Sequence, residues 1–164
     1  MLEKDQMLNL AKNAVNTALG KGATEAEAYV YEGQTTNIGI ERGQVTKSQK
    51  IIDQGLGIRV TVNSAVGFAY TNKIEEPKTI EDIVLRALNS AKASKPDPDW
   101  QGFIEKKPYT TAEKTYDSKI LALRVEDLVN IAFDMLDAAT EVDKRVLPVE
   151  GSVGAAYLSN AIVN

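Results

Sequence analysis

Residues 53–72 alternate apolar and polar side chains along two short stretches. The apolar positions are Ile58, Val60 and Val62, followed by Val66, Phe68 and Tyr70. Because successive side chains of a strand point to opposite faces, a period of two predicts half-buried antiparallel strands. Asn63-Ser64 would form the turn of this hairpin. We expect all of the apolar positions except Tyr70 to lie in the core.

Gly55, Gly57 and Gly67 lie within this predicted hairpin. A dinucleotide-binding loop would need a third glycine and a helix that starts at the loop, and a P-loop would need a GK[ST] sequence. A strand follows Gly57 instead, and no GK[ST] occurs in the chain. We therefore interpret the glycines as backbone-geometry residues. Gly55-Leu56-Gly57 predicts a bulge or bend where another backbone approaches closely.

Three segments repeat their apolar residues with the 3.6-residue period of a helix. They cover about residues 3–19, 79–94 and 125–139. The second begins at a variant capping box formed by Thr79 and Asp82. Its predicted buried stripe is Ile80, Ile83, Val84, Ala87, Leu88 and Ala91. The stripe of the third is Val125, Leu128, Ala132, Met135, Leu136 and Ala139.

Three further strands are predicted before the hairpin, at residues 22–33, 35–42 and 44–52. The last of them is polar, as suits an edge strand that must resist pairing with other molecules. Glu25 and Glu27 share the polar face of the first. Two roles are open for this acidic pair, a solvated strand face and a metal or acid–base site. The first is favoured because no third type of ligand lies nearby.

These elements predict the α+β class. Residues 1–94 would form a two-layer domain of helix, antiparallel sheet with four or five strands, and helix. Residues 95–122 contain three prolines and no sustained period, which is typical of a linker or a long ordered loop. Residues 123–164 would form an incomplete second α+β unit, consisting of a helix and strands at 146–149 and 153–163.

Trp100, Phe103 and Ile104 are apolar residues within the predicted loop. Their exposure to water would be unfavourable, so we expect the loop to be pinned to a surface. Local packing is the favoured explanation, and a contact with a partner is the alternative.

The chain stops at Asn164, inside an apolar predicted strand. We interpret it as a fragment of a longer protein, or as a chain whose last strand completes another sheet.

Composition excludes several kinds of chemistry. The chain has no histidine and no cysteine, so it contains no Ser-His or Cys-His arrangement, no thiolate nucleophile and no His or Cys zinc ligand. Nineteen basic and twenty-three acidic residues give a net charge of −4 without a basic block, which argues against direct nucleic-acid binding. No apolar run reaches the roughly 20 residues of a membrane helix, and the N-terminus lacks a secretory signal. A cytoplasmic protein is expected.

Five motifs together resemble the N-terminal region of the TldD/PmbA family. They are GATEAEAYVYEG (22–33), ERGQV (41–45), GLGIRV (55–60), VGFAYTN (66–72) and AKASKPDPDW (91–100). The resemblance covers residues 7–100 well and residues 120–164 loosely. The KPDPDW segment looks more like the PmbA (TldE) branch than the TldD branch.

This resemblance implies a cytoplasmic protein several times longer than the chain. The TldD branch is a zinc metallopeptidase whose H-E-x-x-x-H motif lies downstream of the matched region. The PmbA branch generally lacks a working motif and partners a TldD-type subunit. No residue of this chain is therefore assigned a catalytic, cofactor-binding or metal-binding role. Zinc is expected only in the longer parent or its partner. The expected partners are a TldD/PmbA-type subunit, in a homo- or heterodimer, and a peptide substrate.

The leading functional hypothesis is the N-terminal portion of a TldD/PmbA-type metallopeptidase subunit. It would supply scaffold and part of a peptide chamber and would not be catalytic by itself. One alternative is a stand-alone module that binds extended peptides by adding them to a sheet edge. Another is a gyrase-associated regulator, in line with the family's naming as modulators of DNA gyrase.

Overall fold

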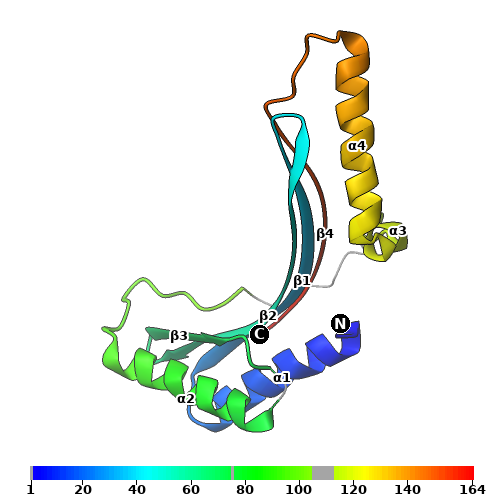
Figure 1. The fold of residues 1–164 in the computed structure, drawn as a ribbon. Helices are drawn as coiled ribbons and strands as arrows, with labels where there is room; N and C mark the ends of the chain where they lie inside the picture. Colours follow the sequence, from blue (N-terminus) through cyan, green and yellow to red (C-terminus); the bar gives the residue numbers. More distant parts are fainter. Residues whose placement is uncertain (1, 75, 105–112) are drawn as a thin grey trace. The chain divides into compact units, whose positions relative to one another are not determined.

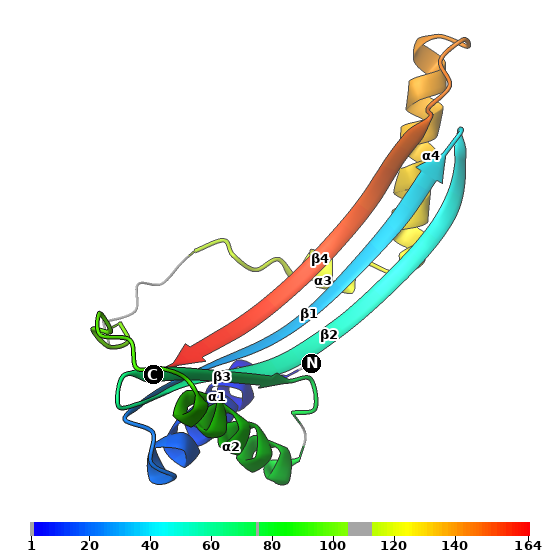
Figure 2. The same cartoon turned by 90° about the vertical axis from the view of Figure 1, so that its left-hand side faces the viewer.

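The computed structural model describes residues 2–74, 76–104 and 113–164. Helices and strands form an α+β arrangement around one four-stranded antiparallel sheet with the strand order β3-β2-β1-β4 (Figures 1 and 2). In chain order the elements are α1 (Lys4–Gly20), β1 (Glu25–Glu41), β2 (Gln44–Val62), β3 (Ala65–Thr71), α2 (Pro77–Ala93), α3 (Ser118–Ala122), α4 (Val125–Val142) and β4 (Glu150–Val163). The predicted fold class is confirmed.

The chain forms two compact units, which we call unit 1 and unit 2. Unit 1 comprises Met1–Glu32, Asp53–Thr110 and Ser159–Asn164, and unit 2 comprises Gly33–Ile52 and Thr111–Leu158. Strands β1, β2 and β4 therefore contribute residues to both. The boundaries expected from the sequence, at 1–94, 95–122 and 123–164, stay a prediction, and residues 105–112 of the expected loop lie outside the described residues.

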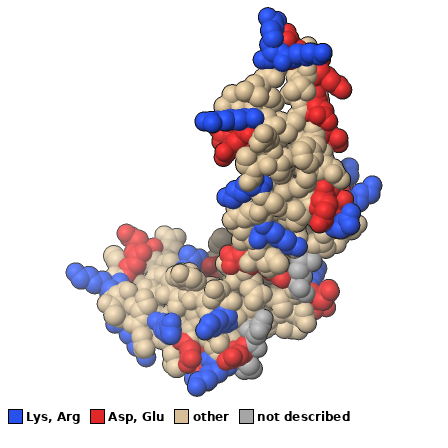
Figure 3. Space-filling model, in the orientation of Figure 1, with Lys and Arg blue, Asp and Glu red and all other residues tan. Residues whose placement is uncertain are grey.

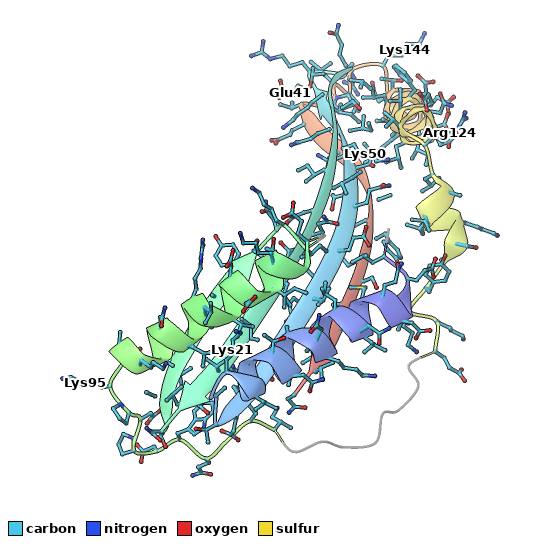
Figure 4. The ribbon with its side chains drawn as sticks, turned by 90° about the horizontal axis from the view of Figure 1, so that it is seen from below. Lys21, Glu41, Lys50, Lys95, Arg124 and Lys144 are labelled. Atoms are coloured by element: carbon cyan, nitrogen blue, oxygen red, sulfur yellow. The ribbon has the colours of Figure 1, made fainter. Side chains whose placement is uncertain are left out.

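The core of unit 1 lies between one face of the sheet and helices α1 and α2, which pack side by side (Figure 4). Its α1 side is built from small residues, including Ala11, Ala14 and Ala18, which let the helix lie close to the strands. The predicted stripe of α2 is buried at all six positions. Burial of such an apolar stripe, rather than intrinsic helix propensity, supplies most of the stability of a helix of this length.

Helix α2 begins two residues before the predicted start. Glu76 is the N-cap without a side-chain cap, and Pro77 occupies the first turn. Proline is favoured there because its missing N–H would have no partner within the helix. The expected capping box at Thr79 and Asp82 is therefore wrong, since both residues already lie inside the helix.

Gly67 of β3 marks the closest approach between the sheet and α2. A Cβ atom at this position would lie 2.1 Å from the carbonyl oxygen of Ala87 and 2.3 Å from the amide nitrogen of Ala91. Only glycine fits under the helix backbone at this separation. The face of β3 that looks toward α2 is accordingly made of small residues, with Ala65 and Gly67 both buried.

This close approach reverses the orientation that we expected for β3. Ile58 and Val60 are fully buried as predicted, whereas Phe68 is 57% exposed and lies on the opposite face. Val62 and Val66 are only half-buried. The core prediction for Phe68 is wrong because a period of two does not say which face is covered, and the bulky residues of β3 have no room beneath α2.

The predicted turn at Asn63-Ser64 is confirmed, and a second turn with the same geometry joins β1 to β2. Asn63 and Ser64 have φ values of 50° and 63°, and Arg42 and Gly43 have φ values of 51° and 75°. Positive φ at both central residues is the geometry of a type I′ hairpin turn, whose twist matches that of the flanking strands. The pairing of β2 with β3 is regular from Leu56↔Thr71 to Val62↔Ala65.

The strands are longer than expected. β1 runs without interruption through the two predicted strands at 22–33 and 35–42, and β2 joins the predicted strand at 44–52 to the hairpin. The expected strand at 146–149 is wrong. There the carbonyl oxygens of Pro148 and Val149 accept hydrogen bonds from the turn amides of Gly43 and Arg42, at 2.8 and 2.9 Å.

In unit 2, α4 packs against one face of its strands. Ile38 and Ile40 meet Leu128, Ala132 and Leu136 in a small core. The predicted stripe of α4 is thus confirmed at its centre, while Met135 is 42% exposed. The short helix α3, within the expected loop, was not predicted from the sequence. At its start the carboxylate of Asp117 accepts a hydrogen bond of 2.8 Å from the amide of Lys119.

We predict that Gly67→Ala destabilises the chain by about 3 kcal/mol, because the added methyl group meets backbone atoms that cannot move independently. The free energy of unfolding in urea measures the effect. Gly20→Ala is the matched control, since nothing lies within 4 Å of the added Cβ and alanine is the better helix former. Equal stability of the two variants would contradict the close approach.

Candidate functional site

The face of the unit 1 sheet opposite α1 and α2 carries a cleft of about 540 Å³. We call it the aromatic cleft. Its lining residues come from all four strands and are Glu27, Tyr29, Tyr31, Leu56, Gly57, Arg59, Phe68, Tyr70, Thr71 and Ile162. A concave, mainly apolar surface with a few polar groups is the usual form of a ligand site.

The cleft is built around the glycines of β2. A Cβ atom on Gly55 would lie 2.6 Å from Cε1 of Tyr31 and 3.1 Å from the carbonyl oxygen of Thr71. A Cβ atom on Gly57 would lie 3.3 Å from Cε2 of Phe68. Both rings therefore rest against the β2 backbone. The close approach of another backbone is confirmed at Gly55, whereas at Gly57 the neighbour is a ring. The pairing of β2 with β3 is one-to-one from Leu56 to Val62, so the paired residues contain no bulge.

Two pairs of rings flank this glycine segment. Tyr29 and Tyr31 of β1 stack with a centroid distance of 6.0 Å, and Phe68 and Tyr70 of β3 stack at 6.3 Å. Tyr70 is 75% exposed. Exposed aromatic rings gathered around a hollow present a large contact area that loses little side-chain entropy on binding.

A carboxylate lies beside the rings. The hydroxyl of Tyr31 donates a hydrogen bond of 3.0 Å to Asp53. This bond, with smaller contributions from burial and from the negative charge of Asp53, raises the pKa of Tyr31 above its ordinary value of 10.0. Tyr29 and Tyr70 act in the same direction, so the three phenols and Asp53 form one electrostatic group.

Arg59 is the only cation among the residues that line the aromatic cleft. Its guanidinium donates to Glu27 at 2.8 Å and lies 4.8 Å from the ring centroid of Phe103. The pair is partly exposed, so it contributes little to stability. The pair engages the charges of both Arg59 and Glu27. The carboxylate of Asp53, in contrast, accepts a hydrogen bond from Tyr31, and among the described hydrogen bonds none joins it to Arg59.

Glu25 holds the segment around Trp100 against the sheet. Its carboxylate accepts hydrogen bonds from the indole N–H of Trp100 at 2.8 Å and from the amide of Phe103 and the hydroxyl of Thr61 at 3.4 Å. The rings of Trp100 and Phe103 pack edge to face at 5.2 Å. Local packing is thus confirmed for these two residues, whereas Ile104 is 78% exposed.

The expectation that Glu25 and Glu27 form a solvated face is therefore wrong. Both are half-buried, and each is engaged with a different partner from a distant part of the chain. Sequence spacing could not show that a tryptophan 75 residues away would approach Glu25. Within the described residues, no group of three or more Asp or Glu side chains could hold a metal ion.

The strand expected at a sheet edge, at residues 44–52, lies at an edge, and so does β4. β4 is the last strand in the order, and β3 pairs with residues 56–62 of β2 only, so residues 44–54 have no strand beside β2 on that side within the described part of the chain.

On the face shown in Figure 3, basic and acidic side chains are interspersed. No helix among the described residues has the length and apolar character needed to cross a membrane.

Residues 26–91, which carry most of this site, match the family model of PmbA/TldA metallopeptidase domain 1. This part of the chain is similar to the first domain of the PmbA/TldD family. It is also 28% identical over 143 residues to an uncharacterised protein of Methanocaldococcus jannaschii, covering 86% of the chain and 32% of that protein. The family resemblance inferred from the motifs is confirmed.

Three solved structures share the fold. TldE from Thermococcus kodakarensis has a TM-score of 0.86 at 19% identity, covering 94% of this chain and 34% of that one. A candidate modulator of DNA gyrase from Bacteroides thetaiotaomicron has a TM-score of 0.74 at 22% identity, covering 99% and 36%. One from Thermotoga maritima has a TM-score of 0.76 at 17% identity, covering 94% and 34%. The chain thus spans about a third of the length of these relatives.

The aromatic cleft was not predicted, although one signal for it was present. Tyr29, Tyr31, Phe68 and Tyr70 all occupy the strand face opposite the small, buried residues. For Tyr29 and Tyr31 this is the face that alternation assigned to solvent, where aromatic residues are unusual because such faces are normally polar.

We predict that Glu25→Ala releases Trp100, the only tryptophan, because three donors lose their shared acceptor. Its fluorescence should shift to the red and become more accessible to acrylamide, with a loss of about 1 kcal/mol in stability. Glu25→Gln, which keeps an acceptor oxygen, should have a smaller effect. Glu76→Ala, at an exposed carboxylate, is the control, and unchanged Trp100 emission in Glu25→Ala would refute the clamp.

We predict that Asp53→Asn lowers the pKa of Tyr31, because it weakens the hydrogen bond and removes the charge that raise it. The folded chain holds this proton more tightly than the unfolded chain. The resulting stabilisation is complete below pH 10 and is lost as the pH rises through the folded pKa. NMR titration of ring-labelled tyrosines, assigned with Tyr31→Phe, measures the midpoint. Asp99→Asn should leave it unchanged, and an unaltered midpoint in Asp53→Asn would contradict the assignment.

Proposed function

We propose that this chain is the N-terminal portion of a TldD/PmbA-type metallopeptidase subunit, of the PmbA (TldE)-like branch. It supplies scaffold and part of the wall of a peptide chamber and is not catalytic by itself. The observation that carries the proposal is the match of residues 26–91 to PmbA/TldA metallopeptidase domain 1. The high TM-score with TldE supports the choice of branch through the fold.

The residue chemistry of the chain fits a non-catalytic part. It has no histidine or cysteine, so a zinc ion that activates water would be held by the remaining length of the parent or by a partner subunit. The aromatic cleft supports the peptide-chamber role, since exposed rings beside a hollow are typical anchors for a bound chain. We expect a cytoplasmic protein that works as a homo- or heterodimer with another TldD/PmbA-type subunit and acts on peptides.

The parent protein, produced alone and together with a TldD-type subunit, tests this proposal. We predict hydrolysis of an unfolded peptide substrate by the assembled pair, loss of activity with a chelator and recovery with Zn²⁺. Mass spectrometry of the substrate is the measurement. The 164-residue chain is the inert control. Cleavage by this chain alone in the presence of chelator would refute the proposal.

A stand-alone module that binds extended peptides is a second candidate. The observation that favours it is the position of β4 at the edge of the sheet, where an added strand could pair with its backbone. Two results together would favour this module. The parent would bind peptides without cleaving them in the presence of chelator, and it would remain inactive with every TldD-type partner. A gyrase-associated regulator has less support, because the chain has a net charge of −4 and basic and acidic side chains are interspersed on the face shown in Figure 3.

A further inference from the structure

The aromatic cleft has the chemistry of a site for a positively charged side chain. Its rings come from β1 and β3 and stand on either side of the β2 glycines. The face of an aromatic ring carries negative potential, and a cation within about 6 Å of its centroid is attracted to it.

The polar atoms near the rings also carry negative charge or partial charge. The hydrogen bond from Tyr31 to Asp53, together with burial, the charge of Asp53 and smaller effects of the Tyr29 and Tyr70 phenols, raises the pKa of Tyr31. A carboxylate has about four acceptor positions, and the hydroxyl of Tyr31 uses one of those on Asp53. An ammonium or guanidinium group brings three to five donors, so it complements this group of acceptors better than an apolar or an acidic side chain does.

One lining residue, Arg59, already makes an interaction of the proposed kind with a ring outside the cleft. Arg59 lies over the ring of Phe103 at 4.8 Å and pairs with Glu27. Its charge is thereby committed near Phe103, while Tyr31, which donates to Asp53, has no such cation among the lining residues. An arriving cation would reproduce at the tyrosines the arrangement that Arg59 makes with Phe103 and Glu27.

We propose that the aromatic cleft binds a Lys or Arg side chain of an extended peptide, held between the tyrosine rings and Asp53. This inference deepens the proposed function: the peptide as ligand rests on that function, whereas the preference for a positive charge rests on the cleft alone. Its test requires binding without cleavage, so its failure and a failure of the peptidase assignment are distinguishable.

The test compares three short acetylated and amidated Gly-Ser peptides that differ in one central residue: lysine, norleucine or glutamate. Norleucine keeps the aliphatic chain of lysine and removes the charge. We expect the 164-residue chain to bind the lysine peptide about threefold to tenfold more tightly than the norleucine peptide, as measured by NMR titration. The glutamate peptide should bind more weakly than either.

Two variants locate the effect. Tyr70→Leu removes an exposed ring while keeping apolar bulk, and Asp53→Asn removes the charge, so each should reduce the preference for lysine over norleucine. Tyr116→Leu is the matched control, because Tyr116 of unit 2 is similarly exposed at 60% and lies outside the cleft. Circular dichroism establishes that each variant is folded.

Three results would overturn the inference. The first is binding of norleucine or glutamate at least as tight as that of lysine, which would show that the cleft selects apolar bulk or that Arg59 dominates its potential. The second is a lysine preference that Tyr70→Leu and Asp53→Asn leave intact in folded protein. The third is the absence of any lysine-peptide binding up to millimolar concentration.

Discussion

The contact between α2 and β3 at Gly67 determines which side chains each face of unit 1 can hold. Backbone atoms of the helix come so close to the strand that no Cβ atom fits between them. Such tight packing transmits a constraint to neighbouring positions, because a folded interior has few voids to absorb it. Large residues of β3 must therefore lie on the other face of the sheet. The close helix on one side and the exposed rings of Phe68 and Tyr70 on the other are two results of one contact.

Local sequence rules predicted the fold well wherever the deciding information was itself local. The α2 stripe, the Asn63-Ser64 turn and the alternation of Ile58 and Val60 depend on periodicity and turn chemistry, and the structure agrees with each. Strand ends were less predictable. Pairing with neighbours carries β1 through Gly33 and β2 through Gly55, although both glycines weaken a strand considered alone.

The candidate site depended on information that the sequence pattern does not contain. Alternation defines two faces of β3 but not which one a helix covers, and this choice decided the position of Phe68. Likewise, Glu25 receives Trp100 from a segment far along the chain, so its role depends on tertiary contact. The motifs identified the family without revealing the cleft, because they mark conformational needs of the backbone such as Gly55 and Gly67.

The way the rings of Tyr31 and Phe68 rest on Gly55 and Gly57 also limits how this surface can change. The floor of the cleft is main chain, and any larger residue at Gly55 would displace the Tyr31 ring that shapes it. Variation in ligand preference is consequently confined to the walls, where Tyr29, Tyr70 and Ile162 are exposed and can be exchanged without repacking a core. A fixed floor with replaceable walls would allow one scaffold to serve related proteins that recognise different ligands.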